Sequence, residues 1–221
     1  MDMVPIISVV GQVKSGKTTF IEELVRELKK KNYKIGTLKH TSHSFDMDIK
    51  GKDSYRLKES GSIIGGIFTD DSIGIVRDFN EKKDMDRIIE DIFYDMNIVL
   101  IEGYKLGKYP KILVMKEQDL EEEIKEYKRD EIIAVLGEGE LITELNYFGK
   151  YEIKKIAKFL EGEFIKPYSV QEINLYINNK PVILNDFVQK IVKNIIDAVI
   201  DSLKGIDKKI KEIDLRYKKG K

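Results

Sequence analysis

The chain has 221 residues, enough to bury one good hydrophobic core with a small second module. Its 39 basic and 39 acidic residues give a formal net charge of +0, so overall charge does not favour nucleic acid as a partner. It has no cysteine and two histidines, which excludes disulfides, iron–sulfur clusters and thiolate or three-histidine metal sites. The N-terminus lacks the features of a signal peptide and no apolar stretch has membrane-spanning length, so we expect a cytoplasmic protein that does not enter membranes.

The first predicted strand, at residues 6–10, leads into a glycine-rich turn and a helix. Residues 11–18 read Gly-Gln-Val-Lys-Ser-Gly-Lys-Thr and match the phosphate-loop pattern G-x-x-x-x-G-K-[ST] at every fixed position. Apolar residues at every fourth position indicate the helix: Phe20, Leu24 and Leu28. Because glycines let backbone N–H groups turn towards phosphate oxygens, and a helix N-terminus favours an anion, this segment predicts a nucleotide site. There, Lys17 would reach the β- and γ-phosphates and the Thr18 hydroxyl would hold Mg²⁺.

Predicted strands and helices alternate along the first 160 residues. This alternation is typical of an α/β domain with a mainly parallel sheet flanked by helices, the architecture of phosphate-loop NTPases. The further strands are expected at 34–39, 98–102, 112–115 and 132–136, with a hairpin at 63–69 and 73–77 and helices near 88–96 and 151–160.

A linker is predicted over 161–170, and the pattern changes beyond it. We therefore expect a nucleotide-binding domain at 1–162 and a small C-terminal α+β module at 163–221, with the order β-β-α-β. Its strands would lie at 173–177 and 181–184, joined by a turn at Asn178-Asn179, with a last strand at 213–217. Asn185 would cap a helix whose apolar face, running to Leu203, we expect to be core.

Ionisable side chains gather in the segment 39–54, directly after the predicted second strand. This places them at the carboxyl edge of the sheet, where open α/β folds bind ligands. Asp48 and Asp53 are candidates for holding Mg²⁺, directly or through water. Lys39 and Lys52 could neutralise phosphate charge.

Two histidines in this segment, His40 and His43, are the side chains that titrate near neutral pH. The alternative to a functional segment is a solvated polar loop in which Asp53 or Ser54 caps a helix. Spacing alone does not separate the two interpretations.

A third stretch begins at Glu102, which ends a strand predicted to neighbour the first one. An acidic residue there occupies the place of a Walker-B carboxylate, near Mg²⁺ and its water shell. Gly103 would permit close backbone approach. The alternative is a surface glutamate at the end of a strand.

Together these stretches resemble the molybdopterin-guanine dinucleotide biosynthesis protein B family over about residues 6–160. The motifs that carry the resemblance are the phosphate loop, Lys39-His40 in register with Gly51-Lys52-Asp53-Ser54, and Ile101-Glu102-Gly103-Tyr104-Lys105 followed by Pro110-Lys111-Ile112. The resemblance implies a homodimeric GTP-binding protein with slow Mg²⁺-dependent GTPase activity. Such a protein would assist the molybdopterin guanylyltransferase that attaches GMP to molybdopterin, for the molybdenum or tungsten cofactor, with molybdopterin-carrying proteins as further partners.

The resemblance also implies three groups of site residues. The nucleotide would be held by Gly11, Lys14, Ser15, Gly16, Lys17, Thr18 and Thr19. The metal would be held by Thr18, Asp48 and Glu102. The shared active edge would be lined by Lys39, His40, His43, Lys52, Asp53, Ser54, Gly103 and Lys105.

Guanine preference is not visible as a motif. Many GTPases read the base with Asn-Lys-x-Asp after a strand, and here Asp119 stands at that place without the Asn and Lys. An ordinary strand-end turn explains Asp119 as well. No arginine finger stands at a motif position, although Arg56 or Arg77 could serve across a dimer. A phosphate-loop small-molecule kinase and a nucleotide-gated scaffold therefore stay as alternatives.

Overall fold

The structure is a computed structural model of the whole chain. It describes residues 4–43, 45, 49–78, 89, 92–93, 95–115, 120–138, 144–169, 173, 175–177, 180–182, 184–205 and 213. Contacts divide the chain into two compact units, Met1–Gln171 and Glu172–Lys221. No helix in the described part of the chain is long and apolar enough to cross a membrane.

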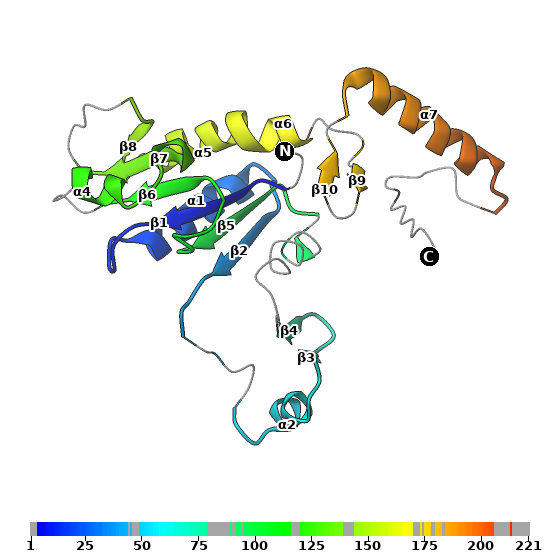
Figure 1. Cartoon of the computed structure of the whole chain (residues 1–221), viewed down its shortest axis with the longest axis horizontal. Helices are drawn as coiled ribbons and strands as arrows, with labels where there is room; N and C mark the ends of the chain where they lie inside the picture. Colours follow the sequence, from blue (N-terminus) through cyan, green and yellow to red (C-terminus); the bar gives the residue numbers. More distant parts are fainter. Residues whose placement is uncertain are drawn as a thin grey trace. The chain divides into compact units, whose positions relative to one another are not determined.

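The first unit contains a six-stranded sheet in the order β2-β5-β1-β6-β7-β8 (Figure 1). Its strands are β1 (Ile6–Val10), β2 (Ile35–Lys39), β5 (Ile98–Glu102), β6 (Lys111–Val114), β7 (Ile132–Gly137) and β8 (Tyr147–Gly149). Every pairing in this sheet is parallel. The expected α/β phosphate-loop fold with a mainly parallel sheet is confirmed, and so is the position of the Glu102 strand beside β1.

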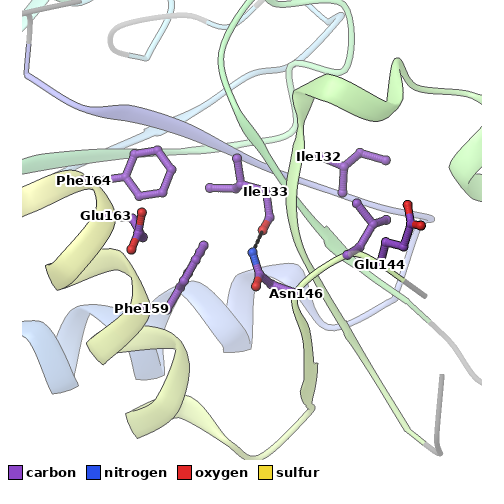
Figure 2. A pocket seen from close by; sticks show the side chains of 8 residues that line it. Ile132, Ile133, Glu144, Asn146, Phe159, Glu163 and Phe164 are labelled. Carbon is purple, nitrogen blue, oxygen red and sulfur yellow. Dashed lines mark hydrogen bonds between the residues drawn. The ribbon is translucent and has the colours of Figure 1, made fainter. Parts of the chain in front are cut away.

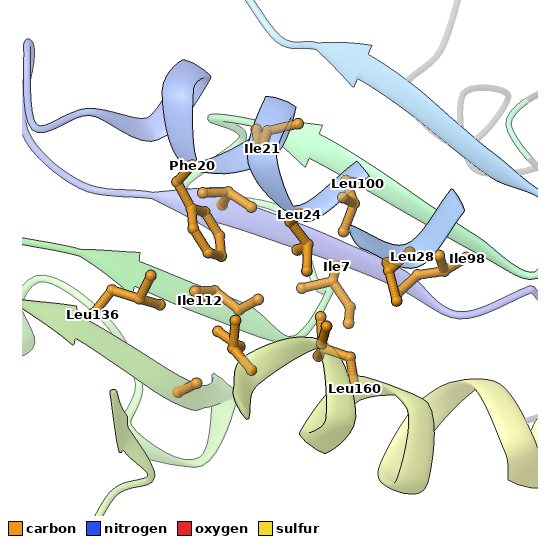
Figure 3. Packing of buried hydrophobic residues seen from close by; sticks show 14 of the residues in the cluster. Ile7, Phe20, Ile21, Leu24, Leu28, Ile98, Leu100, Ile112, Leu136 and Leu160 are labelled. Atoms are coloured by element: carbon orange, nitrogen blue, oxygen red, sulfur yellow. The ribbon is translucent and has the colours of Figure 1, made fainter. Parts of the chain in front are cut away.

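Both faces of the sheet are covered. Successive side chains along each strand point to opposite faces, so alternate residues contribute to the two cores. On one face, α1 (Lys17–Lys30) and α5 (Ile153–Leu160) pack on the strands (Figure 3). Leu24 and Leu28 of α1 are fully buried there against β1 and β5. On the other face, α4 (Leu120–Lys125) contributes Ile124 to a cluster with residues of β6 and β7.

A fully buried lysine closes the amino end of the sheet. Lys111, the first residue of β6, donates from Nζ to the backbone oxygens of Gly107 (2.7 Å) and Tyr109 (3.1 Å). It also pairs with Glu131 at 2.6 Å, just before β7. A buried ammonium needs such partners. The pair therefore fixes the end of the loop that connects β5 to β6.

The segment 161–170 is not the expected linker, because α5 continues through a π-helical turn, η2 (Glu161–Ile165), into α6 (Lys166–Ser169). Ile165 is fully buried in the same core cluster as α1, and Phe164 packs against that cluster. Glu161 accepts hydrogen bonds from Lys31 and from the Tyr33 hydroxyl (3.0 Å), and it pairs with Lys166. These contacts and apolar residues hold the segment on the domain.

This network makes the stability of the protein depend on pH in the acidic range. The Lys31 ammonium, the Tyr33 hydroxyl and Lys166 lower the pKa of Glu161 to about 2. A carboxyl whose pKa is lower in the folded than in the unfolded protein stabilises the fold at any pH above its unfolded-state pKa. That stabilisation is lost as the pH falls from about 4.5 to about 2. We expect Glu161→Gln to lower the melting temperature by a few degrees at pH 7 and by much less at pH 2. Glu163→Gln, on the same turn but exposed, is the control; equal effects of the two variants in a pH series of melting curves would contradict this account.

A helix and a separate hairpin follow β2 in the chain. Helix α2 (Asp53–Glu59) packs on β3 (Ile64–Phe68), which pairs antiparallel with β4 (Ile73–Arg77). The predicted hairpin is thus present. The helix predicted near 88–96 falls mostly outside the described residues, although Ile89 is buried and its carbonyl accepts from the Phe93 amide at 2.9 Å, as in one helical turn.

The second unit contains two antiparallel strands and one long helix, β9 (Leu175–Ile177), β10 (Lys180–Val182) and α7 (Asp186–Ser202). Asn185 caps α7 as predicted, accepting from the Val188 amide at 3.0 Å. The apolar face of α7 is exposed rather than buried, at Phe187, Ile191, Ile195, Val199 and Leu203. The predicted last strand lies outside the described residues except for Ile213, which is in no strand.

Candidate functional site

The phosphate loop connects β1 to α1 at the carboxyl edge of the sheet. Gly11 (φ 142°) and Gly16 (φ 96°) both have positive φ, as does Lys14 (φ 61°). A Cβ on Gly16 would meet nothing within 4 Å, so the space in front of the α1 N-terminus is open. The free backbone amides and the helix dipole at this end favour an anion. The loop therefore has the shape and the electrostatics to hold phosphate.

The Lys17 ammonium already lies over this loop. Its Nζ donates to the backbone oxygens of Gly11 (3.1 Å) and Gln12, and it lies 3.5 Å from the Ser15 hydroxyl. The Ser15 amide in turn donates to the Gln12 oxygen at 3.2 Å. These bonds hold the positive charge at the concave side of the loop, so little rearrangement is needed before phosphate binds.

A hydroxyl and a carboxylate meet beside the loop. The Thr18 hydroxyl donates to Glu102 Oε2 at 2.9 Å, across 84 residues of sequence. The meeting follows from topology, because Glu102 ends β5 and β5 pairs directly with β1. Lys39, paired in register with Glu102 at the end of β2, places its ammonium 3.8 Å from the other carboxylate oxygen. Among the described residues no three His, Asp or Glu side chains gather as a complete metal cage.

This arrangement suits Mg²⁺ bound together with a nucleotide. Mg²⁺ usually keeps several waters and takes one or two protein oxygens plus phosphate oxygens. The Thr18 hydroxyl and the Glu102 carboxylate supply oxygens of the right type at one point of the loop. The donor set therefore fits a magnesium–nucleotide complex.

The end of β2 and the loop after β5 are joined next to this point. The His40 amide donates to the Glu102 carbonyl at 2.9 Å, and the Gly103 amide donates to the Val9 carbonyl at 2.8 Å. The rings of His40 and Tyr104 lie 4.9 Å apart. Four predicted site residues, Thr18, Lys39, His40 and Gly103, thus gather around Glu102.

Lys105 is directed elsewhere. Its ammonium pairs with Glu126 at 2.9 Å and lies 5.6 Å from the centre of the Tyr127 ring. The Glu126 carboxylate keeps the pKa of Lys105 above its usual range. The side chain therefore ties the loop after β5 to the α4 segment rather than facing the Thr18–Glu102 pair.

The other predicted site residues lie on separate elements. Lys52, Asp53 and Ser54 stand at the start of α2, whose packing partner is β3, so their approach to the phosphate loop stays a prediction. The His43 amide donates to the Thr41 hydroxyl at 3.1 Å in the exposed loop after β2. Asp48 and the base-reading candidate Asp119 lie outside the described residues, and Lys14 and Thr19 are exposed on the loop and on α1.

A pocket of about 340 Å³ lies at the opposite end of the sheet from the phosphate loop. Ile132 and Ile133, at the amino end of β7, line it together with Phe159 and Phe164, and Asn146 donates to the Ile133 carbonyl at 3.0 Å (Figure 2). Ligands of open parallel sheets bind at the carboxyl edge. This pocket is therefore separate from the nucleotide site.

Sequence reasoning missed the α4 segment, which contacts the back of the phosphate loop. The backbone amide of Gln12 and the ammonium of Lys17 face the carboxyl of Glu123, which is buried. The pattern of Leu120, Ile124 and Tyr127 could have indicated the helix. Nothing local could have shown that Glu123 is buried.

Comparison with known proteins shows which protein family the chain resembles. The family model described as molybdopterin guanine dinucleotide synthesis protein B, MobB, matches residues 6–138, which include the phosphate loop and the Glu102 strand. The chain is 31% identical over 235 residues to a candidate molybdopterin-guanine dinucleotide biosynthesis adapter protein of Methanocaldococcus jannaschii, covering 95% of this chain and 97% of the relative. It is 29% identical over 164 residues to the adapter protein of Haemophilus influenzae, covering 73% of this chain and 90% of that one.

Solved structures agree with the fold. A crystal structure of molybdopterin-guanine biosynthesis protein B is 28% identical, with a TM-score of 0.56, covering 71% of this chain and 97% of that chain. Bacillus subtilis MobB is 25% identical, with a TM-score of 0.56, covering 72% and 99%. The match to the M. jannaschii protein, in contrast, extends into the second unit.

Proposed function

The chain belongs to the molybdopterin guanine dinucleotide synthesis protein B family, and on that premise we propose that it is an adapter that binds GTP with Mg²⁺. The observation that carries this proposal is the hydrogen bond between Thr18 and Glu102 at the phosphate loop. It joins the two oxygen donors that a magnesium–nucleotide complex needs. The relatives are named as adapters in molybdopterin-guanine dinucleotide biosynthesis, which gives the role in which such a nucleotide would be used.

The phosphates would be held by charge and by backbone donors. Lys17 is a point charge suited to phosphate, and the amides of residues 14–18 and the α1 dipole add to it. Thr18 and Glu102 would hold Mg²⁺, which when bound neutralises charge on the β- and γ-phosphates. Lys39 next to Glu102 lowers the negative charge of the edge further.

We propose that hydrolysis is slow. Within one copy of the chain, Arg56 and Arg77 lie on α2 and at the end of β4 and not on the elements that form the loop, so either would act as a finger only from a second copy. An arginine finger is worth about three to five orders of magnitude in rate. A protein without one suits a binding or handover role. The preference for GTP over ATP rests on the family, whose relatives act in guanine dinucleotide synthesis.

We also propose that the hairpin β3–β4 is the homodimer surface. One of its faces is largely apolar and exposed and carries Ile64, Phe68, Ile73 and Ile75, with Arg77 opposite Ile64 at its end. A two-stranded hairpin is marginally stable alone, and a contiguous apolar face marks an interaction site. A second copy of the chain would cover it with the same face.

Placing a charge on this face should separate the dimer. We expect Phe68→Lys to weaken self-association by roughly 30-fold or more, because a lysine would be buried unpaired at the interface. Tyr151→Lys is the matched control, since Tyr151 is 82% exposed and Phe68 is 81% exposed. Sedimentation velocity over a concentration series measures the effect. A Phe68→Lys protein that associates like the control would contradict the assignment.

The adapter role is tested with a molybdopterin guanylyltransferase, the partner we propose, together with molybdopterin-carrying proteins. GMP transfer to molybdopterin is measured at limiting GTP with no addition, with the wild-type chain and with its Lys17→Ala variant. The proposal expects the wild-type chain to raise the transfer rate and the variant to have no effect. An equal stimulation by both proteins would separate the adapter role from nucleotide binding.

A further inference from the structure

One carboxyl next to the phosphate loop is buried. Glu123 in α4 is 3% exposed, and in the part of the chain that the structure describes neither of its carboxyl oxygens accepts a hydrogen bond of good geometry; the backbone donor that faces it is the Gln12 amide. One turn later, Tyr127 is 8% exposed, and its hydroxyl has no hydrogen bond of good geometry among the described residues, with Lys105 as the side chain that faces it. Buried polar groups in proteins are nearly always hydrogen-bonded, so two such groups together need a reason.

The groups that face Glu123 come from three elements. The phosphate loop and the start of α1 supply the Gln12 amide and the Lys17 ammonium, and the loop after β5 supplies Lys105. The residues just after α4 supply Glu126 and Tyr127. Lys105 is paired with Glu126, and Lys17 with the carbonyls of its own loop. Among the described residues an ionised Glu123 therefore forms no salt bridge, and the charges that attract it, Lys105 and Lys17, are also engaged by Glu126 and by the phosphate loop.

Bound polyphosphate would raise the electrostatic energy of an ionised Glu123 further. Gln12 belongs to the loop that would surround the phosphates, so bound triphosphate brings several negative charges to the same loop. A neutral carboxyl at Glu123 does not oppose them. Burial already raises the pKa of Glu123, and added negative charge raises it further.

We propose that Glu123 controls phosphate binding: its carboxyl takes up a proton when polyphosphate enters the loop at residues 11–18, which removes the buried charge behind Gln12. The proton comes from solvent, and no bond of the nucleotide changes. This inference rests on the proposed nucleotide site, and it adds to that site a residue that neither contacts phosphate nor matches the loop motif. By linkage, nucleotide affinity falls as the pH rises through the range in which free Glu123 ionises.

The test is calorimetric titration of GTP with Mg²⁺ in two buffers of different ionisation enthalpy at pH 7. The wild-type chain should take up a larger fraction of a proton per nucleotide than Glu123→Gln, and Glu123→Gln should bind about 3- to 10-fold more tightly at pH 8. Glu22→Gln, with the same charge change on the exposed face of α1 and no interaction with Glu123, should keep the wild-type proton number. Equal proton uptake by wild type and Glu123→Gln would overturn the inference.

A nucleotide-free measurement distinguishes this inference from failure of the proposed function. With a raised pKa in the folded state, Glu123 costs stability as the pH rises above about 4.5, until the folded-state pKa is passed. Glu123→Gln, or Glu123→Met if the amide packs badly, should raise the melting temperature by about 2–4 °C at pH 8 and leave it unchanged at pH 4. If no nucleotide bound but this gain was found, only the binding proposal would fail. If the gain was absent, Glu123 would not be an uncompensated charge and the inference would be wrong.

Discussion

Replacing Lys17 with alanine is expected to weaken GTP binding by roughly 100-fold or more, since it removes the charge-assisted bonds to two phosphate groups. The rest of the site should stay in place, because Gly16 is held by its bond to the Phe20 amide and Thr18 by its bond to Glu102. The carbonyls of Gly11 and Gln12 lose their ammonium partner; Gln12 is exposed, so water replaces the ammonium there. Calorimetry measures the affinity, and circular dichroism and melting curves check the fold.

Lys29→Ala is the matched control for this experiment. It removes the same charge from the other end of α1, in the exposed last turn of the helix. We expect normal GTP binding by the control. If Lys17→Ala bound GTP like Lys29→Ala, the phosphate loop would not be the nucleotide site.

The second large effect is expected from Gly11→Ala. A Cβ at this position would lie 2.2 Å from the backbone carbonyl oxygen of Val114 in the neighbouring strand β6, and its φ of 142° is unfavourable for alanine. Neither β1 nor β6 can move easily to make room, because Val10 of β1 and Leu113 of β6 are fully buried. We expect a loss of about 3 kcal/mol or more, which is a fall in melting temperature of about 6–12 °C, and with it the loss of phosphate binding.

Gly162→Ala is the comparison for this variant. Gly162 lies in the η2 turn, and a Cβ there would meet nothing within 4 Å. Alanine in a helical turn should leave the melting temperature unchanged or raise it slightly. A Gly11→Ala protein as stable as Gly162→Ala would show that β1 and β6 are not packed as described.

The main fold could be predicted from sequence because its elements are long and strongly patterned. The buried runs of β1 and β5 and the fourfold spacing of Phe20, Leu24 and Leu28 are determined by burial on one sheet. The three-residue strand β8 was not predicted, because a short edge strand has no pattern of its own. Gly162 and Pro167 favour a linker at 161–170, yet the burial of Ile165 outweighs both and the segment 161–169 is helical.

The site could be predicted only where a motif sets the geometry. The phosphate loop and the strand order bring Thr18 to Glu102, and both follow from patterns visible in the chain. The direction of Lys105 depends on Glu126, which local sequence does not reveal. The same is true of Glu123, whose burial arises from the packing of α4 against the back of the loop.

The central claim is that this chain binds GTP with Mg²⁺ at the phosphate loop. It is tested most directly by calorimetric titration of the wild-type chain with GTP and with ATP, each in Mg²⁺ and in EDTA. The account predicts one site per chain, tighter binding of GTP than of ATP, and weaker binding without Mg²⁺. Equal or tighter binding of ATP would contradict the guanine-nucleotide role and favour a kinase or an ATPase.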